Sequence, residues 1–240
     1  MKKLLQLFTG IVLLGTLGFF MLRETLPPCS DEIISTTYIA VVTAIALESE
    51  PFKDLLEGNE TCTSGGIAYT VGNLEGKNIL MFLSGVGPDE VEKVIRQTLT
   101  TFTIDRVVFS GVAGGVDTAL QLGDTVVARE WLDVRTGERV TTDADLIKKM
   151  EQFEGVRVVP LGATVDSFVS DRTTLPNGVS VVDMETATIA LLAKEFGVPF
   201  LAFRSASDFA DDGGTDATFR IAAEASASAT VRFILESELN

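Results

Sequence analysis

The chain has 240 residues, of which 46% are hydrophobic and 8% aromatic, so it is neither disordered nor of low complexity and can bury the core of one globular domain. Its formal net charge of −15 would repel phosphate backbones and anionic lipid head groups, which argues against nucleic-acid binding and peripheral membrane binding. It contains no histidine, which excludes histidine-dependent triads and imidazole bases, so acid–base chemistry would depend on carboxylates.

The N-terminal segment has the pattern of an export signal. Lys2 and Lys3 precede an uncharged apolar run over residues 4–22, and the pair Pro27-Pro28 follows shortly after it. The run is also long enough to span a membrane, so we expect residues 1–30 to be either a cleaved signal peptide or an uncleaved membrane anchor. With the lysines remaining inside, the rest of the chain would be extracytoplasmic: periplasmic, secreted or held at the membrane surface.

The two cysteines, Cys29 and Cys62, do not settle their own pairing. A disulfide between them is compatible with a location outside the cytoplasm. A pair of cysteines in a sequence cannot establish it, so both states stay open.

From residue 36 to residue 240 short apolar, β-branched runs alternate with helical patterns, which predicts one α/β domain around a mostly parallel sheet. No internal repeat or linker divides this region. The predicted strands cover residues 38–45, 79–84, 106–110, 124–128, 156–161, 179–182 and 200–203. The predicted helices cover residues 49–57, 88–101, 143–153, 184–196 and 215–238.

Polar and glycine-rich turns follow these strands, at the edge of a parallel sheet where ligands bind. Glu48 and Glu50 follow the first strand, Glu185 follows the sixth and Asp208 follows the seventh, while SGVGP (84–88) and SGVAGG (110–115) follow the second and third. Each feature alone has an ordinary structural explanation, as a tight turn or as an acidic residue at a helix N-terminus. Their common placement predicts a ligand site.

Four segments carry a resemblance to a known family: ALESE (46–50), SGVAGG (110–115), DSFV (166–169) and VVDMETATIALLAKEFGVPFLAFRSASD (181–208). From about Tyr38 to the C-terminus the chain resembles the nucleoside phosphorylase and nucleosidase superfamily, most closely the 5′-methylthioadenosine/S-adenosylhomocysteine nucleosidases. The resemblance implies a three-layer α/β sandwich around a mixed, mostly parallel central sheet. It also implies a small-molecule nucleoside substrate, no cofactor or metal, and a homodimer.

The resemblance further implies roles for individual residues. Asp208 would protonate N7 of adenine, and Glu50 would position and deprotonate the attacking water. The remaining residues would bind the substrate, Glu185 and Met184 at the ribose and the others around the purine: Phe168, Val169, Ala113 and Gly114. Such a site needs only carboxylates, because they stabilise the oxocarbenium-like sugar that forms as adenine departs.

The predicted function is hydrolysis of the N-glycosidic bond of an adenine nucleoside, such as 5′-methylthioadenosine or S-adenosylhomocysteine, to adenine and free sugar. A phosphate-dependent purine nucleoside phosphorylase is an alternative, but the glycine-rich turns bring no Arg or Lys and Glu50 would repel phosphate. A non-catalytic exported nucleoside-binding or storage protein is the other. Differences from the family at Pro88 and Val165, and a shortened segment between Glu130 and Asp166, predict a different purine-side loop and 5′ side.

Overall fold

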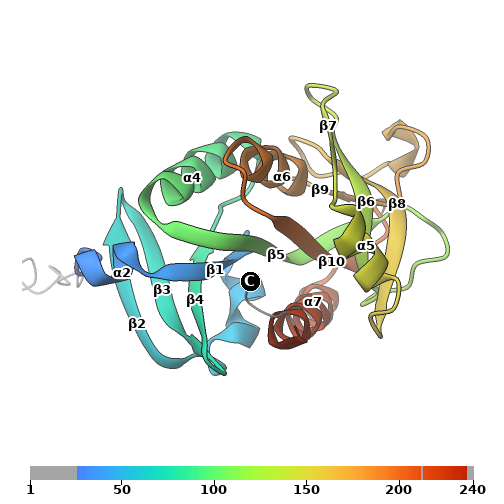
Figure 1. Ribbon diagram of the computed structural model, residues 1–240. Helices are drawn as coiled ribbons and strands as arrows, with labels where there is room; N and C mark the ends of the chain where they lie inside the picture. The colour runs from blue at the N-terminus through green and yellow to red at the C-terminus, as the bar shows by residue number, and fades with distance from the viewer. Residues whose placement is uncertain (1–25, 212, 237–240) are drawn as a thin grey trace, which may run out of the picture.

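Buried β-branched runs form the strands of the central sheet in the computed structural model, which describes residues 26–211 and 213–236 (Figure 1). In β1 every residue from Tyr38 to Thr43 is buried, because helices cover both faces of the sheet. The strands are β1 (Thr37–Thr43), β2 (Glu57–Ser64), β3 (Ile67–Leu74), β4 (Lys77–Leu83), β5 (Thr103–Gly115), β6 (Thr125–Asp133), β7 (Arg139–Thr141), β8 (Val156–Thr164), β9 (Val181–Asp183) and β10 (Phe200–Asp208).

The long strand β5 divides the sheet into a closed ring and an open extension. In the ring β5 pairs with β10, β10 with β6, β6 with β8, β8 with β9, and β9 returns to the end of β5. In the extension β1 pairs in parallel with β5 and β4, and β3 and β2 follow as antiparallel strands. The sheet is therefore mixed, as expected.

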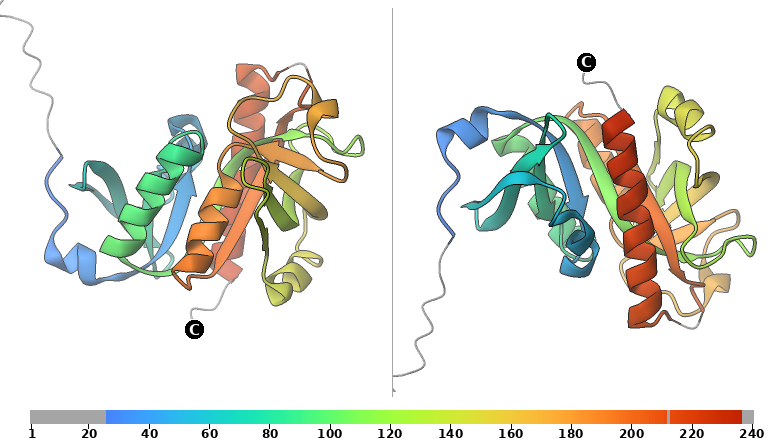
Figure 2. Two further views of the ribbon diagram at one scale, coloured as in Figure 1. Left: turned by 90° about the horizontal axis from the view of Figure 1, so that it is seen from above. Right: turned by 90° about the horizontal axis from the view of Figure 1, so that it is seen from below.

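Three helices form the outer layers. Figure 2 shows α4 (Pro88–Thr101) and α6 (Thr186–Glu195) on one face of the sheet and α7 (Asp216–Glu236) on the other. Arg96 of α4 and Glu195 of α6 form an ion pair of 2.7 Å, so these two helices lie side by side. The three-layer α/β sandwich is confirmed. The shorter helices are α2 (Asp31–Ser35), α3 (Ala46–Ser49), α5 (Ala144–Met150) and the 3₁₀ turns η1 (Glu50–Phe52) and η2 (Arg172–Thr174).

The hairpin of β2 and β3 was not among the predicted strands, and the helix predicted over residues 49–57 was wrong. β2 is exposed over its first five residues and has the polar sequence EGNETCTS, so it lacks the apolar run that marks a buried strand. Gly65 and Gly66, with φ of 58° and 81°, make the two-residue turn between the strands. Helix α3 passes into a 3₁₀ turn at Glu50, because Pro51 has no amide to donate to a longer helix.

Residues 27–36 belong to the packed domain, although its boundary was expected at residue 36. Thr63 of β2 donates its amide to the carbonyl of Pro27 (2.8 Å), and Cys29 donates to the carbonyl of Thr63 (3.0 Å). Cys29 and Cys62 form a disulfide, which resolves the alternative that the sequence left open. The apolar run over residues 4–22 lies outside the described residues. Within the described part of the chain, no helix is long and apolar enough to cross a membrane.

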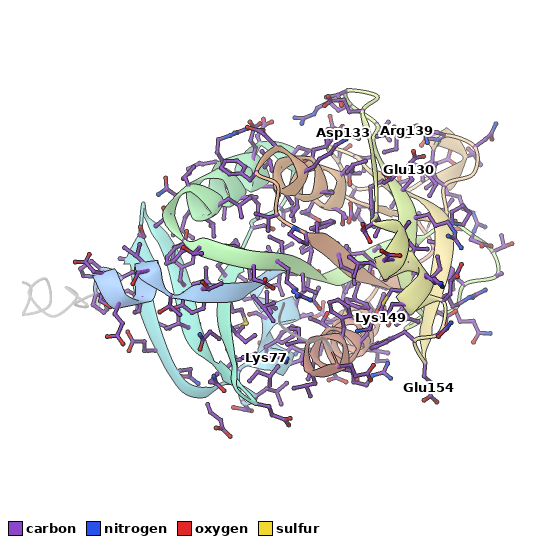
Figure 3. The ribbon with its side chains drawn as sticks, viewed as in Figure 1. Lys77, Glu130, Asp133, Arg139, Lys149 and Glu154 are labelled. Carbon is purple, nitrogen blue, oxygen red and sulfur yellow. A yellow bond between two sulfur atoms is a disulfide. The ribbon has the colours of Figure 1, made fainter. Side chains whose placement is uncertain are left out.

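The segment after Glu130, which was expected to be shorter than in the family, forms a tight hairpin of β6 and β7. Glu130 and Arg139 pair across the two strands, and Asp133 accepts the amide of Arg135 (2.9 Å) in the turn (Figure 3). The Arg135 side chain reaches Asp89 at the start of α4, at 2.9 Å. The hairpin is thereby tied to the helix that follows the Gly85–Gly87 turn.

Candidate active site

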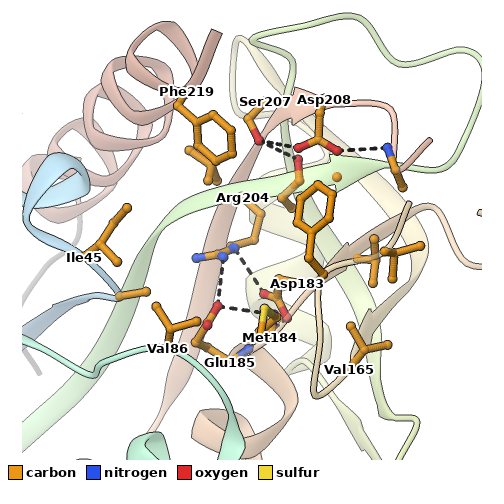
Figure 4. A pocket seen from close by; sticks show the side chains of 18 of the residues that line it. Ile45, Val86, Val165, Asp183, Met184, Glu185, Arg204, Ser207, Asp208 and Phe219 are labelled. Carbon is orange, nitrogen blue, oxygen red and sulfur yellow. Dashed lines mark hydrogen bonds and ion pairs between the residues drawn. The ribbon is translucent and has the colours of Figure 1, made fainter. Parts of the chain in front are cut away.

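A cavity of about 160 Å³ opens at the carboxyl ends of β1, β5, β9 and β10 (Figure 4). Its lining includes every predicted site residue except Glu50: Asp208, Glu185, Met184, Phe168, Val169, Ala113 and Gly114. The lining also contains three charged residues for which the resemblance implied no role, namely Glu48, Asp183 and Arg204. Among the described residues no cluster of three His, Cys, Asp or Glu side chains could hold a metal ion.

Glu48 enters the cavity from the turn that follows β1. Its side chain is buried, and backbone amides surround its carboxylate. One oxygen, Oε2, accepts hydrogen bonds from the amides of Ala44 (2.7 Å) and Ile45 (3.3 Å), and Oε1 accepts one from the amide of Val112 (2.8 Å). The turn after β1 and the SGVAGG segment of β5 therefore both hold this carboxylate in place.

Glu50 lies outside the cavity, and its expected position at the attacking water must be corrected. Its side chain is 48% exposed and pairs with Arg220 of α7 at 3.0 Å. Residues two positions apart on a helical turn point in different directions, so Glu48 and Glu50 cannot face the same site. The carboxylate that this turn supplies to the cavity is that of Glu48.

Asp208 lies at the end of β10 and is buried. The Ser207 hydroxyl donates to its Oδ2 (2.9 Å), and the Ala210 amide donates to its Oδ1 (2.9 Å). Gly114 pairs in the sheet with both Asp208 and Val182, and a Cβ atom at Gly114 would lie 3.1 Å from Asp208 Oδ1. The glycine of the SGVAGG segment thus leaves room for the carboxylate where the ring of strands closes.

Arg204, Asp183 and Glu185 form a buried ionic cluster beneath the cavity (Figure 4). Arg204 Nε lies 3.2 Å from Asp183 Oδ2, and Nη2 lies 3.5 Å from Glu185 Oε2. The guanidinium also lies 4.3 Å from the centre of the Phe109 ring. An arginine within the apolar strand FLAFRSAS signalled such a cluster, because a buried charge requires opposite charges around it.

Glu185 combines burial with proximity to other charges. Its Oε1 accepts a hydrogen bond from the Gly87 amide (3.2 Å). Burial raises the pKa of the Glu185 carboxyl to about 7, with a further increase from the negative charge of Asp183 and an opposing effect of Arg204. Glu185 therefore changes its charge near neutral pH.

Apolar side chains form the rest of the cavity wall. Phe168, 57% exposed, and Val169 lie on the loop after β8, while Met184 lies beside Glu185. Ile45, Val86 and Phe219 line the cavity as well, and Figure 4 shows them on the side away from Val165. The cavity can accordingly bind a flat apolar ring and a polar ligand group at the same time.

Comparisons with known proteins show which family this fold belongs to. The family model of the phosphorylase superfamily matches residues 38–236. A 5′-methylthioadenosine/S-adenosylhomocysteine nucleosidase of Listeria welshimeri is 30% identical over 231 residues, which cover 82% of this chain and 98% of that protein. The crystal structure of the Neisseria meningitidis 5′-methylthioadenosine/S-adenosylhomocysteine nucleosidase in complex with methylthio-immucillin-A has a TM-score of 0.74 at 27% identity, covering 82% of this chain and 98% of that one. The native futalosine hydrolase of Helicobacter pylori has a TM-score of 0.75 at 25% identity, covering 86% and 100%.

Proposed function

Because the chain belongs to the phosphorylase superfamily, and within it to the 5′-methylthioadenosine/S-adenosylhomocysteine nucleosidases, we propose that it hydrolyses a 5′-alkylthio adenine nucleoside to adenine and free sugar. The observation that carries this proposal is the buried Glu48 carboxylate, which three backbone amides hold at a cavity that also contains Asp208. Together they supply a base for water and an acid for the leaving purine.

In the proposed reaction Glu48 takes a proton from water as the water oxygen forms its bond to C1′ of the ribose. The bond between C1′ and N9 of adenine breaks, and Asp208 delivers a proton to N7, so adenine leaves as a neutral base. The positive charge that develops on the sugar lies among buried carboxylates, which stabilise it electrostatically. Glu185 accepts hydrogen bonds from the ribose hydroxyls. Phe168, Val169 and Met184 contact the purine and the sugar.

Hydrolysis is favoured over phosphorolysis by the charges around the cavity. Of the described residues that line it, Arg204 is the one cation, and its charge is already balanced by Asp183 and Glu185. A phosphate would bring further negative charge next to Glu48, which the site does not compensate. The apolar side chains of Ile45, Val86 and Phe219 suit an uncharged 5′-alkylthio group.

A product assay tests the proposal. Residues 26–240 would be incubated with 5′-methylthioadenosine, adenosine and inosine, each with and without inorganic phosphate, and the sugar product would be identified. We expect free sugar, release of adenine without phosphate, and no cleavage of inosine. A sugar 1-phosphate formed only with phosphate would identify a phosphorylase, and binding without any cleavage would identify a binding or storage protein.

We also propose that the domain acts outside the cytoplasm, exported or anchored by the apolar run over residues 4–22. The Cys29–Cys62 disulfide supports this location, since disulfides persist in oxidising compartments. Separating cytosolic, membrane and extracytoplasmic fractions of cells that express the full chain tests it. Recovery of the intact chain from the cytosol alone would contradict it.

Homodimerisation is the further proposal that the family suggests. Val86 is 51% exposed at the cavity and Phe168 is 57% exposed, which leaves apolar surface beside the opening. Sedimentation equilibrium of residues 26–240 measures the oligomeric state. A monomer at every concentration tested would contradict this proposal.

A further inference from the structure

Asp183 lies next to the proposed ribose-binding carboxylate but directs its own oxygens into the protein. Oδ1 accepts hydrogen bonds from the Thr164 hydroxyl (2.7 Å) and from the amides of Glu185 (3.3 Å) and Thr186 (3.2 Å). Oδ2 accepts the Thr186 hydroxyl and pairs with Arg204 Nε. These donors come from β8, from the start of α6 and from β10, so the Asp183 carboxylate is held by protein groups on several sides.

The same Arg204 side chain serves two buried carboxylates. Asp183 pairs with its Nε and Glu185 with its Nη2, and the guanidinium lies against the Phe109 ring. One positive charge therefore faces two negative charges in a region shielded from water. In such a cluster the ionisation of one carboxylate opposes the ionisation of the other.

We propose that Asp183 is a positioning residue for the proposed reaction: by sharing Arg204 with Glu185 it controls both the orientation and the charge of the ribose-binding carboxylate. Asp183 also fixes the backbone of Glu185, through the Glu185 and Thr186 amides. The role of Asp183 in catalysis rests on the proposed function. The ionic coupling among Asp183, Glu185 and Arg204 does not.

The charged groups that face Glu185 determine how its pKa responds when one of them is removed. They are Asp183 on β9, Arg204 on β10 and Glu48 on α3, and the Gly87 amide adds a hydrogen bond from the turn before α4. Removing the charge of Asp183 removes one of the two carboxylates that pair with Arg204, so Glu185 keeps its ion pair with Arg204 and no longer faces the negative charge of Asp183. The ionised form of Glu185 is then favoured, and its titration moves to lower pH.

Carbon-13 NMR of the side-chain carboxyls tests this directly, with the Glu185 signal assigned by its loss in Glu185→Gln. We expect Asp183→Asn to lower the Glu185 midpoint by at least about one pH unit. Thr186→Val is the matched control, because it removes one hydrogen bond to Asp183 and keeps the charge of Asp183. The titration midpoint of Glu185 in this variant should stay near that of the wild type. If Asp183→Asn is unfolded, Asp183→Ser removes the same charge and leaves room for a water molecule.

An unchanged midpoint in the folded Asp183 variant, or an equal shift in Thr186→Val, would overturn the inference. The NMR titration needs no turnover, so it separates the two proposals. A shifted midpoint in a protein that does not hydrolyse nucleosides would support the coupling and refute the proposed function. Hydrolysis with an unmoved midpoint would refute the coupling alone.

Discussion

Replacing Glu48 by glutamine separates the two glutamates of the ALESE turn. The three amides that point at the carboxylate require an acceptor on both oxygens, and glutamine offers one oxygen and one NH₂ group. The NH₂ group must face the amide of Val112 or those of Ala44 and Ile45, which leaves at least one buried donor unsatisfied. We therefore expect a loss of about 1–3 kcal/mol in the free energy of unfolding. Turnover should fall by about 10²–10⁴-fold, because glutamine cannot accept the proton of water.

The assay compares Glu48→Gln with Glu50→Gln, measuring adenine release from 5′-methylthioadenosine, equilibrium binding of an adenine nucleoside, and urea unfolding of each variant. The exposed pair of Glu50 with Arg220 contributes at most about 1 kcal/mol, so Glu50→Gln should keep near-wild-type stability and turnover. A large loss of turnover in Glu50→Gln with an active Glu48→Gln would refute the assignment. The urea unfolding curve shows whether a loss of turnover in Glu48→Gln comes from loss of folding or from loss of the base.

Asp208→Asn should lower turnover by about 10²–10⁴-fold while nucleoside binding is largely retained, and a variant that keeps more than about a tenth of wild-type turnover would rule out its role as the acid. Replacing Cys29 and Cys62 together by serine should lower the free energy of unfolding by about 3–4 kcal/mol, because the disulfide closes a loop with a sequence separation of 33. Denaturant titrations measure this loss, and turnover should persist. An unchanged free energy of unfolding would contradict the prediction. The pKa of Glu185 is raised to about 7 in the folded state, so its stabilising contribution is present below the unfolded value near 4.5 and is lost as pH rises through 7. Thermal unfolding between pH 4.5 and 8 should show this decline in the wild type and not in Glu185→Gln, and parallel profiles would contradict it.

The sequence predicted the strands that have continuous apolar runs, and it missed β2, which is exposed over its first five residues, and β3, in which buried and partly exposed residues mix. β1, β4 and β10 have continuous apolar runs, so their existence followed from hydrophobicity alone. In the hairpin of β2 and β3, only β2 is a polar strand at the edge of the sheet. The one clear signal of the hairpin was the Gly65-Gly66 pair, which is typical of a two-residue hairpin turn.

The sequence predicted which segments form the candidate site, but not which carboxylate of the ALESE turn enters it. The position of Asp208, Glu185 and the SGVAGG segment at this cavity followed from where their strands end, whereas their individual roles came from the family resemblance. The choice between Glu48 and Glu50 depended on the helical phase of a turn of only four residues, which a spacing pattern does not define. The pairing of Arg204 with Asp183 depends on how β9 and β10 enter the ring, a contact that no local pattern encodes.

Closure of the strand ring also links the site to the order in which the chain can fold. β5 begins at residue 103, whereas β10, which pairs with it, ends at residue 208 and carries both Arg204 and Asp208. A nascent chain that has not reached residue 208 therefore has no complete cavity, however well β1 to β4 are formed. Contacts between such distant segments form slowly, because the intervening chain must first be ordered. A ligand that binds in this cavity would consequently stabilise the completed ring and not its earlier intermediates.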